Sequence, residues 1–141
     1  RWSSPMALRV RRVVTDHDKQ GRAIIASDET CANAVTGRPG HARLDLWKGA
    51  DGTVFRLVEY QPGVAPRKHR TETLDYAVVL SGEIDMELDG SVVHLRAGDT
   101  LVQQGTLHNW VNRGTQPCVI AFVLVPAKPA ERDGKQLHAL G

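Results

Sequence analysis

The sequence has no long hydrophobic run, and its longest apolar stretch, Val119–Val125, has the length of a single strand. A helix needs about 20 consecutive apolar residues to cross a bilayer, so a transmembrane helix is excluded. Sustained heptads are also missing, and the 13 glycines follow no three-residue period. Coiled-coil and collagen-like structures are therefore excluded as well.

An excess of charge of either sign is missing too, since 18 Lys and Arg face 16 Asp and Glu. A nucleic-acid partner is not expected, because it requires a basic stripe or face. Cysteine is scarce: Cys31 and Cys118 lie far apart and outside any Cys/His cluster, which argues against a disulfide scaffold or a zinc ribbon. Residues 1–5 show no apolar segment typical of a signal peptide, and we expect a cytoplasmic protein without a membrane partner.

The dominant pattern in the sequence is an alternation with a period of two. Ile84, Met86 and Leu88 alternate with acidic residues, and the dipeptide 89–90, Asp-Gly, favours a tight hairpin turn. Runs of strand length recur about every 8–12 residues between Gly, Pro and Asp, which is typical of an all-β sandwich or barrel. At most, residues 130–140 would form one or two helical turns.

The length of 141 residues predicts a single domain. We divide it into an N-terminal arm with the first strands, which pack on the barrel, over residues 1–43, a barrel core over residues 44–127 and a C-terminal tail over residues 128–141.

Chemistry-bearing residues gather in two clusters, 63–82 and 98–112. Each cluster places one histidine, His69 or His108, near a glycine-rich bend beside a strand. One hairpin separates the clusters, and an antiparallel barrel can bring such segments side by side. We therefore expect the two histidines to have functional roles.

These clusters resemble the two sequence motifs of the cupins. The first matches in its spacing, although Thr71 stands where the motif has its second His and Asp75 where it has Glu; the matching positions are Gly63, His69, Thr71, Asp75 and Gly82. The second is one residue shorter than usual, with Gln103 in place of Pro; its matching positions are Gly98, Asp99, Gly105, His108 and Asn112. The resemblance implies a double-stranded β-helix, the jelly-roll cupin barrel, in a protein that often dimerises.

In metal-binding cupins, three His and one Glu hold the ion. Carried over by position, the resemblance makes His69, His108 and Asp75 the candidate ligands of a divalent transition metal (Fe, Mn, Ni or Zn) and the candidate catalytic residues. Two imidazoles and one carboxylate match the facial triad of non-haem Fe(II) sites. The alternatives are a weak or empty site, and a site in which the two histidines act as acid and base without metal. Asp75 could instead cap a turn or pair with a nearby arginine.

Further residues are candidates for binding the substrate. Tyr76 and Trp110 could line the pocket, since Trp110 shares the parity of His108. In the strand 53–60, one alternating set faces the barrel interior, and a buried Arg56 or Glu59 would need a partner that the substrate could supply. The remaining histidines are expected at the surface; they are His17, His41, His94 and His138.

Together these features predict a metal-dependent cupin acting on a small organic molecule, such as an oxo- or hydroxy-acid or an aromatic, polyketide-like compound. The reaction would be of the decarboxylase, dehydratase or isomerase, or dioxygenase type. Non-redox chemistry is slightly preferred because a shortened ligand set still makes a Lewis acid. The alternative is a non-catalytic small-molecule binder with a degenerate or empty metal site. Uncovered edges before Leu44 and at Val119–Val125 predict a homodimer.

Overall fold

The computed structural model describes residues 8–141, and these residues form strands and turns without any helix. Six strands make the larger sheet in the order β3 (Val35–Arg38), β4 (His41–Lys48), β5 (Val54–Tyr60), β11 (Cys118–Pro126), β6 (Thr73–Ser81) and β9 (Thr100–Gln104). The smaller sheet has the order β10 (Asn109–Val111), β7 (Glu83–Glu87) and β8 (Val92–Arg96). All of these pairs are antiparallel.

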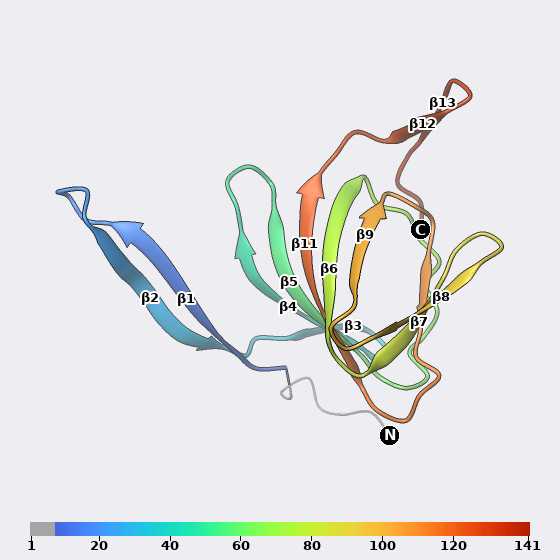
Figure 1. Cartoon of the computed structure of the whole chain (residues 1–141), viewed down its shortest axis with the longest axis horizontal. Helices are drawn as coiled ribbons and strands as arrows, with labels where there is room; N and C mark the ends of the chain where they lie inside the picture. The colour runs from blue at the N-terminus through green and yellow to red at the C-terminus, as the bar shows by residue number, and fades with distance from the viewer. Residues whose placement is uncertain (1–7) are drawn as a thin grey trace.

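The two sheets curve around one interior and form a barrel (Figure 1). An isolated bridge between His69 and His108 links the segment before β6 to the segment before β10. The predicted all-β jelly roll is thereby confirmed. Among residues 8–141 there is also no helix with the length and apolarity that crossing a membrane requires.

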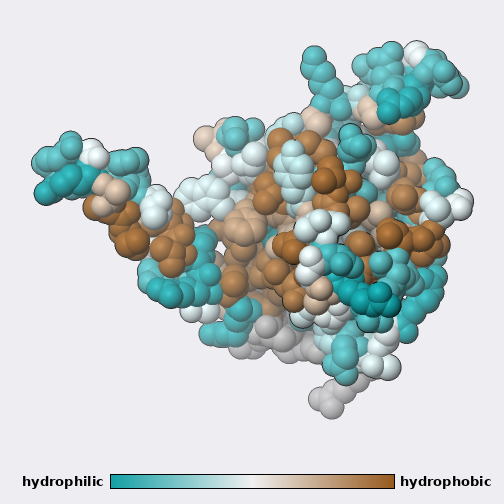
Figure 2. All heavy atoms as spheres, in the orientation of Figure 1, coloured by the Kyte–Doolittle hydropathy of each residue, from teal (hydrophilic) through white to brown (hydrophobic). Residues whose placement is uncertain are grey.

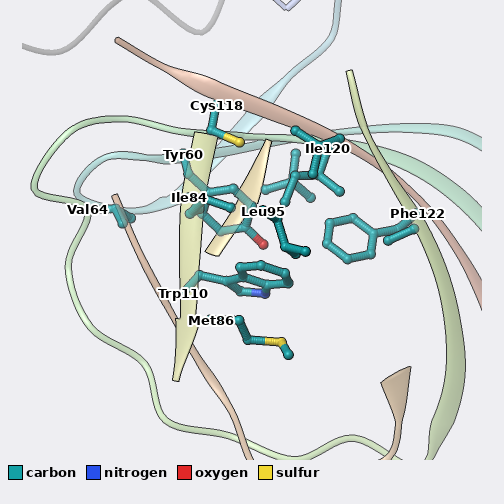
Figure 3. Close-up of a cluster of buried hydrophobic side chains, with 12 residues drawn as sticks. Tyr60, Val64, Ile84, Met86, Leu95, Trp110, Cys118, Ile120 and Phe122 are labelled. Atoms are coloured by element: carbon teal, nitrogen blue, oxygen red, sulfur yellow. The ribbon is translucent and has the colours of Figure 1, made fainter. Parts of the chain in front are cut away.

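The barrel interior holds the main hydrophobic core. On β7, Ile84 and Met86 are almost completely buried while Asp85 and Glu87 keep contact with solvent, as the period-two pattern predicts. Figure 3 shows these two side chains beside the rings of Trp110 and Phe122. Burying one such large apolar side chain contributes about 1.5–3 kcal/mol to stability, so this cluster holds the two sheets together.

A glycine is required at the bend between β6 and β7. Gly82 has a φ of 73°, and a Cβ there would lie 2.3 Å from the carbonyl oxygen of Pro117. Gly90, in the predicted β7–β8 hairpin, has a similar φ of 75° but open space around it. Only the first glycine therefore has a steric reason in addition to its backbone conformation.

Two hairpins extend from the barrel. The N-terminal arm, β1 (Val10–His17) and β2 (Ala23–Cys31), projects to one side (Figure 1). Its base packs on the outer face of the larger sheet, where Leu8 joins Leu44, Leu46 and Leu57 in a second buried cluster.

Residues 130–140 were expected to form at most one or two helical turns, and this expectation is wrong. They contain a C-terminal hairpin of β12 (Ala130–Arg132) and β13 (Lys135–Leu137). Asp133 and Gly134 both have positive φ, the Asp-Gly turn chemistry that also marks the β7–β8 hairpin. Of the predicted divisions, the boundary at residue 44 falls inside β4, whose partner β3 also belongs to the barrel sheet.

Candidate functional site

A cavity of about 310 Å³ opens within the barrel. Its walls come from inward-facing side chains of β3, β4, β5, β6, β10 and β11 and from the segments before β6 and β10. Both motif histidines and Asp75 line it, together with Arg56 and Trp110. The structure thus brings together five of the seven predicted site residues.

The two histidines lie directly opposite each other. Each backbone N–H of His69 and His108 donates to the other residue's carbonyl oxygen at 3.0 Å. Residues paired in this way point their side chains to the same face, and the two ring centroids are 4.4 Å apart. The main chain of the neighbouring Arg67 is fixed as well, because its N–H donates to the Asn109 side-chain oxygen at 2.8 Å.

Both imidazoles are held by the carbonyl two residues earlier. Nδ1 of His69 lies 3.0 Å from the carbonyl oxygen of Arg67, and Nδ1 of His108 lies 2.9 Å from that of Thr106. A carbonyl oxygen only accepts hydrogen bonds, so each Nδ1 carries the proton and each Nε2 keeps a lone pair. The side-chain amide of Gln103 also contacts Nδ1 of His108. A protonated Nδ1 requires the oxygen of this amide, rather than its NH₂ group, to face the ring as a second acceptor.

Burial keeps both rings neutral. It lowers the pKa of His108 to about 4, although the hydrogen bond to Thr106 opposes the shift. Burial also lowers the pKa of His69, against the hydrogen bond to Arg67. At neutral pH the pair therefore consists of two uncharged imidazoles, each able to accept a proton at Nε2.

A row of oxygen-bearing side chains continues from His69 along β6. The hydroxyls of Thr71 and Thr73 share a hydrogen bond of 2.9 Å, and the Thr73 hydroxyl donates to Oδ1 of Asp75 at 2.6 Å. Asp75 is buried, and this burial raises the pKa of its carboxyl despite the bond from Thr73. Positions 69, 71, 73 and 75 all line the cavity, which agrees with the alternation expected of a strand.

The aromatic wall of the cavity is formed by Trp110 and its neighbours. The indole ring stands edge-on to His108 with centroids 6.1 Å apart, and it also packs against Tyr60 and Phe122. Figure 3 shows Trp110 beside the ring of Phe122 in the barrel interior. Trp110 therefore lines the cavity, as the sequence predicts.

Two predicted substrate-binding residues lie elsewhere. Tyr76 is 47% exposed on the outer face of the larger sheet, because its neighbour Asp75 faces inward and adjacent strand residues alternate. On β5 the inward set contains Arg56, so Glu59 points to the other face. There its buried carboxylate accepts a hydrogen bond from the Gln61 amide at 2.6 Å. The pocket predictions for Tyr76 and Glu59 are wrong for these reasons.

Sequence reasoning also missed several residues that line the cavity. His41 was expected at the surface, yet its ring lines the cavity and stands edge-on to Tyr60 at 5.4 Å. Arg38, Arg43 and Arg67 line the cavity as well. The signal for β4 was present in the sequence, because polar residues 41, 43 and 45 alternate with apolar residues 42, 44 and 46.

The donor set does not assemble as the metal prediction requires. Within residues 8–141 no group of three or more His, Cys, Asp and Glu side chains is arranged to hold an ion. Asp, one methylene shorter than the motif's Glu, places its carboxylate in a hydrogen bond with Thr73. The cavity also carries four arginines, of which three have no acidic side-chain partner among the described residues, and these charges repel a cation. As arranged, these residues do not fit a tightly held divalent ion.

Comparisons with known proteins agree with the fold and the motifs. Residues 56–125 match the family model described as Cupin domain (Cupin_2). The phomopsin biosynthesis cluster protein C′ of Diaporthe leptostromiformis is 36% identical over 95% of this chain and 87% of that protein. The cupin-domain-containing oxidoreductase fogC of Aspergillus ruber is 41% identical over 92% of this chain and 79% of that protein.

Among solved structures, the chain is similar to an uncharacterized conserved protein with a double-stranded β-helix domain from Klebsiella pneumoniae. The TM-score is 0.56 and the sequence identity 25%, over 66% of this chain and 83% of that chain. This likeness agrees with the jelly-roll barrel described above.

Proposed function

The chain belongs to the cupin family, and from its cavity we propose that it transfers a proton on a small carbonyl compound, with His69 as the base. The reaction class is isomerisation or dehydration, the non-redox part of the range expected from the sequence. The observation that carries the proposal is the histidine pair, whose rings lie 4.4 Å apart with both Nδ1 atoms held by backbone carbonyls.

The proposed step begins at Nε2 of His69, a half-buried residue that lines the cavity. Its lone pair takes the proton from the carbon next to the substrate carbonyl. The C–H bond breaks and its electron pair moves to the carbonyl oxygen, which gives an enolate. Positioned bases of this kind contribute about 10²–10⁴-fold to the rate.

Asp75 is proposed as the acid that protonates or hydrogen-bonds the enolate oxygen. Its raised pKa makes the protonated form more available than in an exposed carboxyl group. In a substrate with a β,γ double bond, the imidazolium of His69 returns the proton to the γ-carbon, the electron pair on oxygen re-forms the carbonyl, and the Asp75 carboxylate takes back any proton it gave, which completes an isomerisation. If a hydroxyl group stands on the neighbouring carbon, the imidazolium protonates it and water leaves, which completes a dehydration.

A redox reaction is the second candidate, because the relative fogC, 41% identical, is named an oxidoreductase. In that case the substrate would exchange electrons with a co-substrate, and the histidine pair would move only the accompanying proton. The two candidates differ in a measurable way. Proton transfer exchanges carbon-bound hydrogen with solvent without consuming an oxidant or a reductant.

The experiment uses phenylpyruvate, which has an acidic C–H next to a carbonyl group. Keto–enol conversion is followed by ultraviolet absorbance, and exchange of the C–H for deuterium by NMR in D₂O. We expect catalysis above the buffer rate, and a loss of about 10²–10⁴-fold in His69→Gln. His17→Gln, at an exposed position on the arm, is the matched control and should keep the full rate.

Two outcomes contradict the proposal. Exchange at the buffer rate in the wild-type protein, or an unchanged rate in His69→Gln, removes His69 as the base. The same assay is repeated after extensive treatment with a chelator, alongside metal analysis of the untreated protein. Loss of activity on chelation, restored by one added divalent metal, would replace this proposal with the metal-dependent mechanism.

A further inference from the structure

One wall of the cavity carries a strong positive charge. Four arginines line the cavity, whereas the only acidic residue among its lining side chains is Asp75. One of the four is already neutralised, because Nε of Arg56 donates to Oδ1 of Asp45 at 2.6 Å. The other three are Arg38, Arg43 and Arg67.

These three arginines surround His41. Arg38 is paired with His41 across β3 and β4, and Arg43 and Arg67 line the same cavity as the His41 ring. Burial, together with the charges of these three arginines, lowers the pKa of His41 to about 4. Arg38 and Arg67 also repel each other directly. The three residues come from the end of β3, from β4 and from the segment before β6, so the fold itself gathers like charges at one place.

Acidic side chains do not compensate this charge. In residues 8–141, no side-chain carboxylate lies within ion-pair distance of Arg38, Arg43 or Arg67. Arg38 donates to the backbone carbonyl of Ala65 at 3.0 Å, and Arg67 donates to an oxygen of Gly141, the last residue of the sequence, at 3.0 Å. Nδ1 of His41 is buried there without a hydrogen-bond partner among the described residues.

Such an arrangement is stabilised by an anion. Arg38 is half-buried, and like charges gathered at one place cost free energy unless an opposite charge pairs with them. The planar guanidinium fork matches a carboxylate in two parallel hydrogen bonds. Another part of the cavity wall is apolar, formed by Trp110, Phe122 and Leu124. A ligand that satisfies both walls has a carboxylate at one end and an apolar body at the other.

We infer that the cavity binds an organic carboxylate, with its carboxylate group on Arg38, Arg43 and His41 and its apolar body against Trp110. This inference rests on the proposed function, since it names the substrate class for the same cavity. It also gives the substrate an orientation: the carboxylate anchors the molecule at the arginine wall, and the carbon chain extends toward the histidine pair.

The first test compares ligands on the unchanged protein by isothermal titration calorimetry. Phenylacetate and phenylacetamide have nearly the same shape and differ in charge, while acetate has the charge without the ring. Hydrogen bonds to charged groups account for about ten- to hundredfold in affinity, so phenylacetate should bind at least tenfold more tightly than phenylacetamide. It should also bind more tightly than acetate and than inorganic phosphate.

The second test changes the protein. Arg38→Gln should weaken phenylacetate binding about tenfold or more and leave phenylacetamide binding unchanged. Arg22→Gln is the matched control, because this exposed arginine pairs with Asp18 in the connection between β1 and β2, and the arm that these strands form projects away from the barrel (Figure 1). If Arg38→Gln does not fold by circular dichroism, Arg43→Gln, at an exposed position, takes its place.

The outcomes separate this inference from the proposed function. Equal affinities for phenylacetate and phenylacetamide, or unchanged binding in the arginine variants, overturn the carboxylate site. Tighter binding of inorganic phosphate than of phenylacetate also overturns it, in favour of a phosphate site. His69→Gln should lose phenylpyruvate conversion and still bind phenylacetate. Carboxylate binding without any conversion in the wild-type protein leaves a binding module and refutes only the proton transfer.

Discussion

Folding stability should depend on pH through the buried ring of His108. This side chain belongs to a residue that is only 4% exposed, and burial lowers its pKa to about 4, against an ordinary value of 6.5. The folded state therefore resists protonation, whereas the unfolded chain accepts a proton near pH 6.5. The contribution of His108 to stability is complete above pH 6.5 and is lost as the pH falls from 6.5 toward 4.

The magnitude follows from the two pKa values. Each unit between them is worth about 1.36 kcal/mol, so the full loss between pH 6.5 and 4 is about 3 kcal/mol, of which about 2 kcal/mol is lost by pH 5. His69 contributes with the same sign, because its pKa is also lowered. Asp75 contributes with the opposite sign, because a raised carboxyl pKa makes the folded state bind its proton more readily.

Urea unfolding of the wild-type protein and His108→Gln, at neutral pH and at about pH 5, isolates this one residue. The variant is expected to lose about 2 kcal/mol less stability than the wild type over this interval, because the other groups titrate in both proteins. His17→Gln, with an exposed ring, should keep the wild-type profile. Parallel pH profiles for wild type and His108→Gln would refute the argument that burial holds this ring neutral.

Three further outcomes are expected. Gly82→Ala and Gly90→Ala both place a side chain at positive φ, which costs about 1–2 kcal/mol of folding stability. Only Gly82→Ala adds a clash with the backbone, which costs about 1–3 kcal/mol more. Equal losses of stability in urea unfolding would contradict the steric argument. Thr71→His places a third imidazole on the face of the histidine pair and should raise Zn²⁺ affinity in calorimetry; no gain shows that position 71 does not reach the pair. The chain is proposed to form a homodimer through the apolar groove between the arm and the outer sheet face, where apolar side chains gather in Figure 2, so light scattering should give twice 15.5 kDa. Phe55→Glu in that groove should halve the mass, and Val92→Glu, at an exposed position on β8 of the smaller sheet, should not. A monomeric wild-type protein removes the interface.

The motif spacing in the sequence was enough to predict that His69 and His108 converge. Each stands near a glycine-dependent bend, and one hairpin lies between the two segments, so antiparallel pairing brings them together. Local alternation likewise predicted the buried face of β7. The same alternation already argues against the expectation that Asp75 and Tyr76 both line the cavity, because adjacent residues of a regular strand point to opposite faces.

Other features were decided only by the tertiary structure. Either alternating set of β5 could face the barrel interior, and only sheet curvature and the cover from the arm turned Arg56 inward and Glu59 outward. The cluster of Arg38, Arg43 and Arg67 combines residues from three segments whose proximity no local pattern encodes.

The sequence by itself determined the period of its strands, the positions of its turns and the spacing of its histidines, because these depend on neighbours along the chain. Tertiary structure decided which charges share the cavity and which ring atoms are free. The Nδ1 proton of His108 is placed by the Thr106 carbonyl, whose position depends on the bridge to His69. Burial, which sets the pKa of this ring, exists only once the two sheets have closed around it.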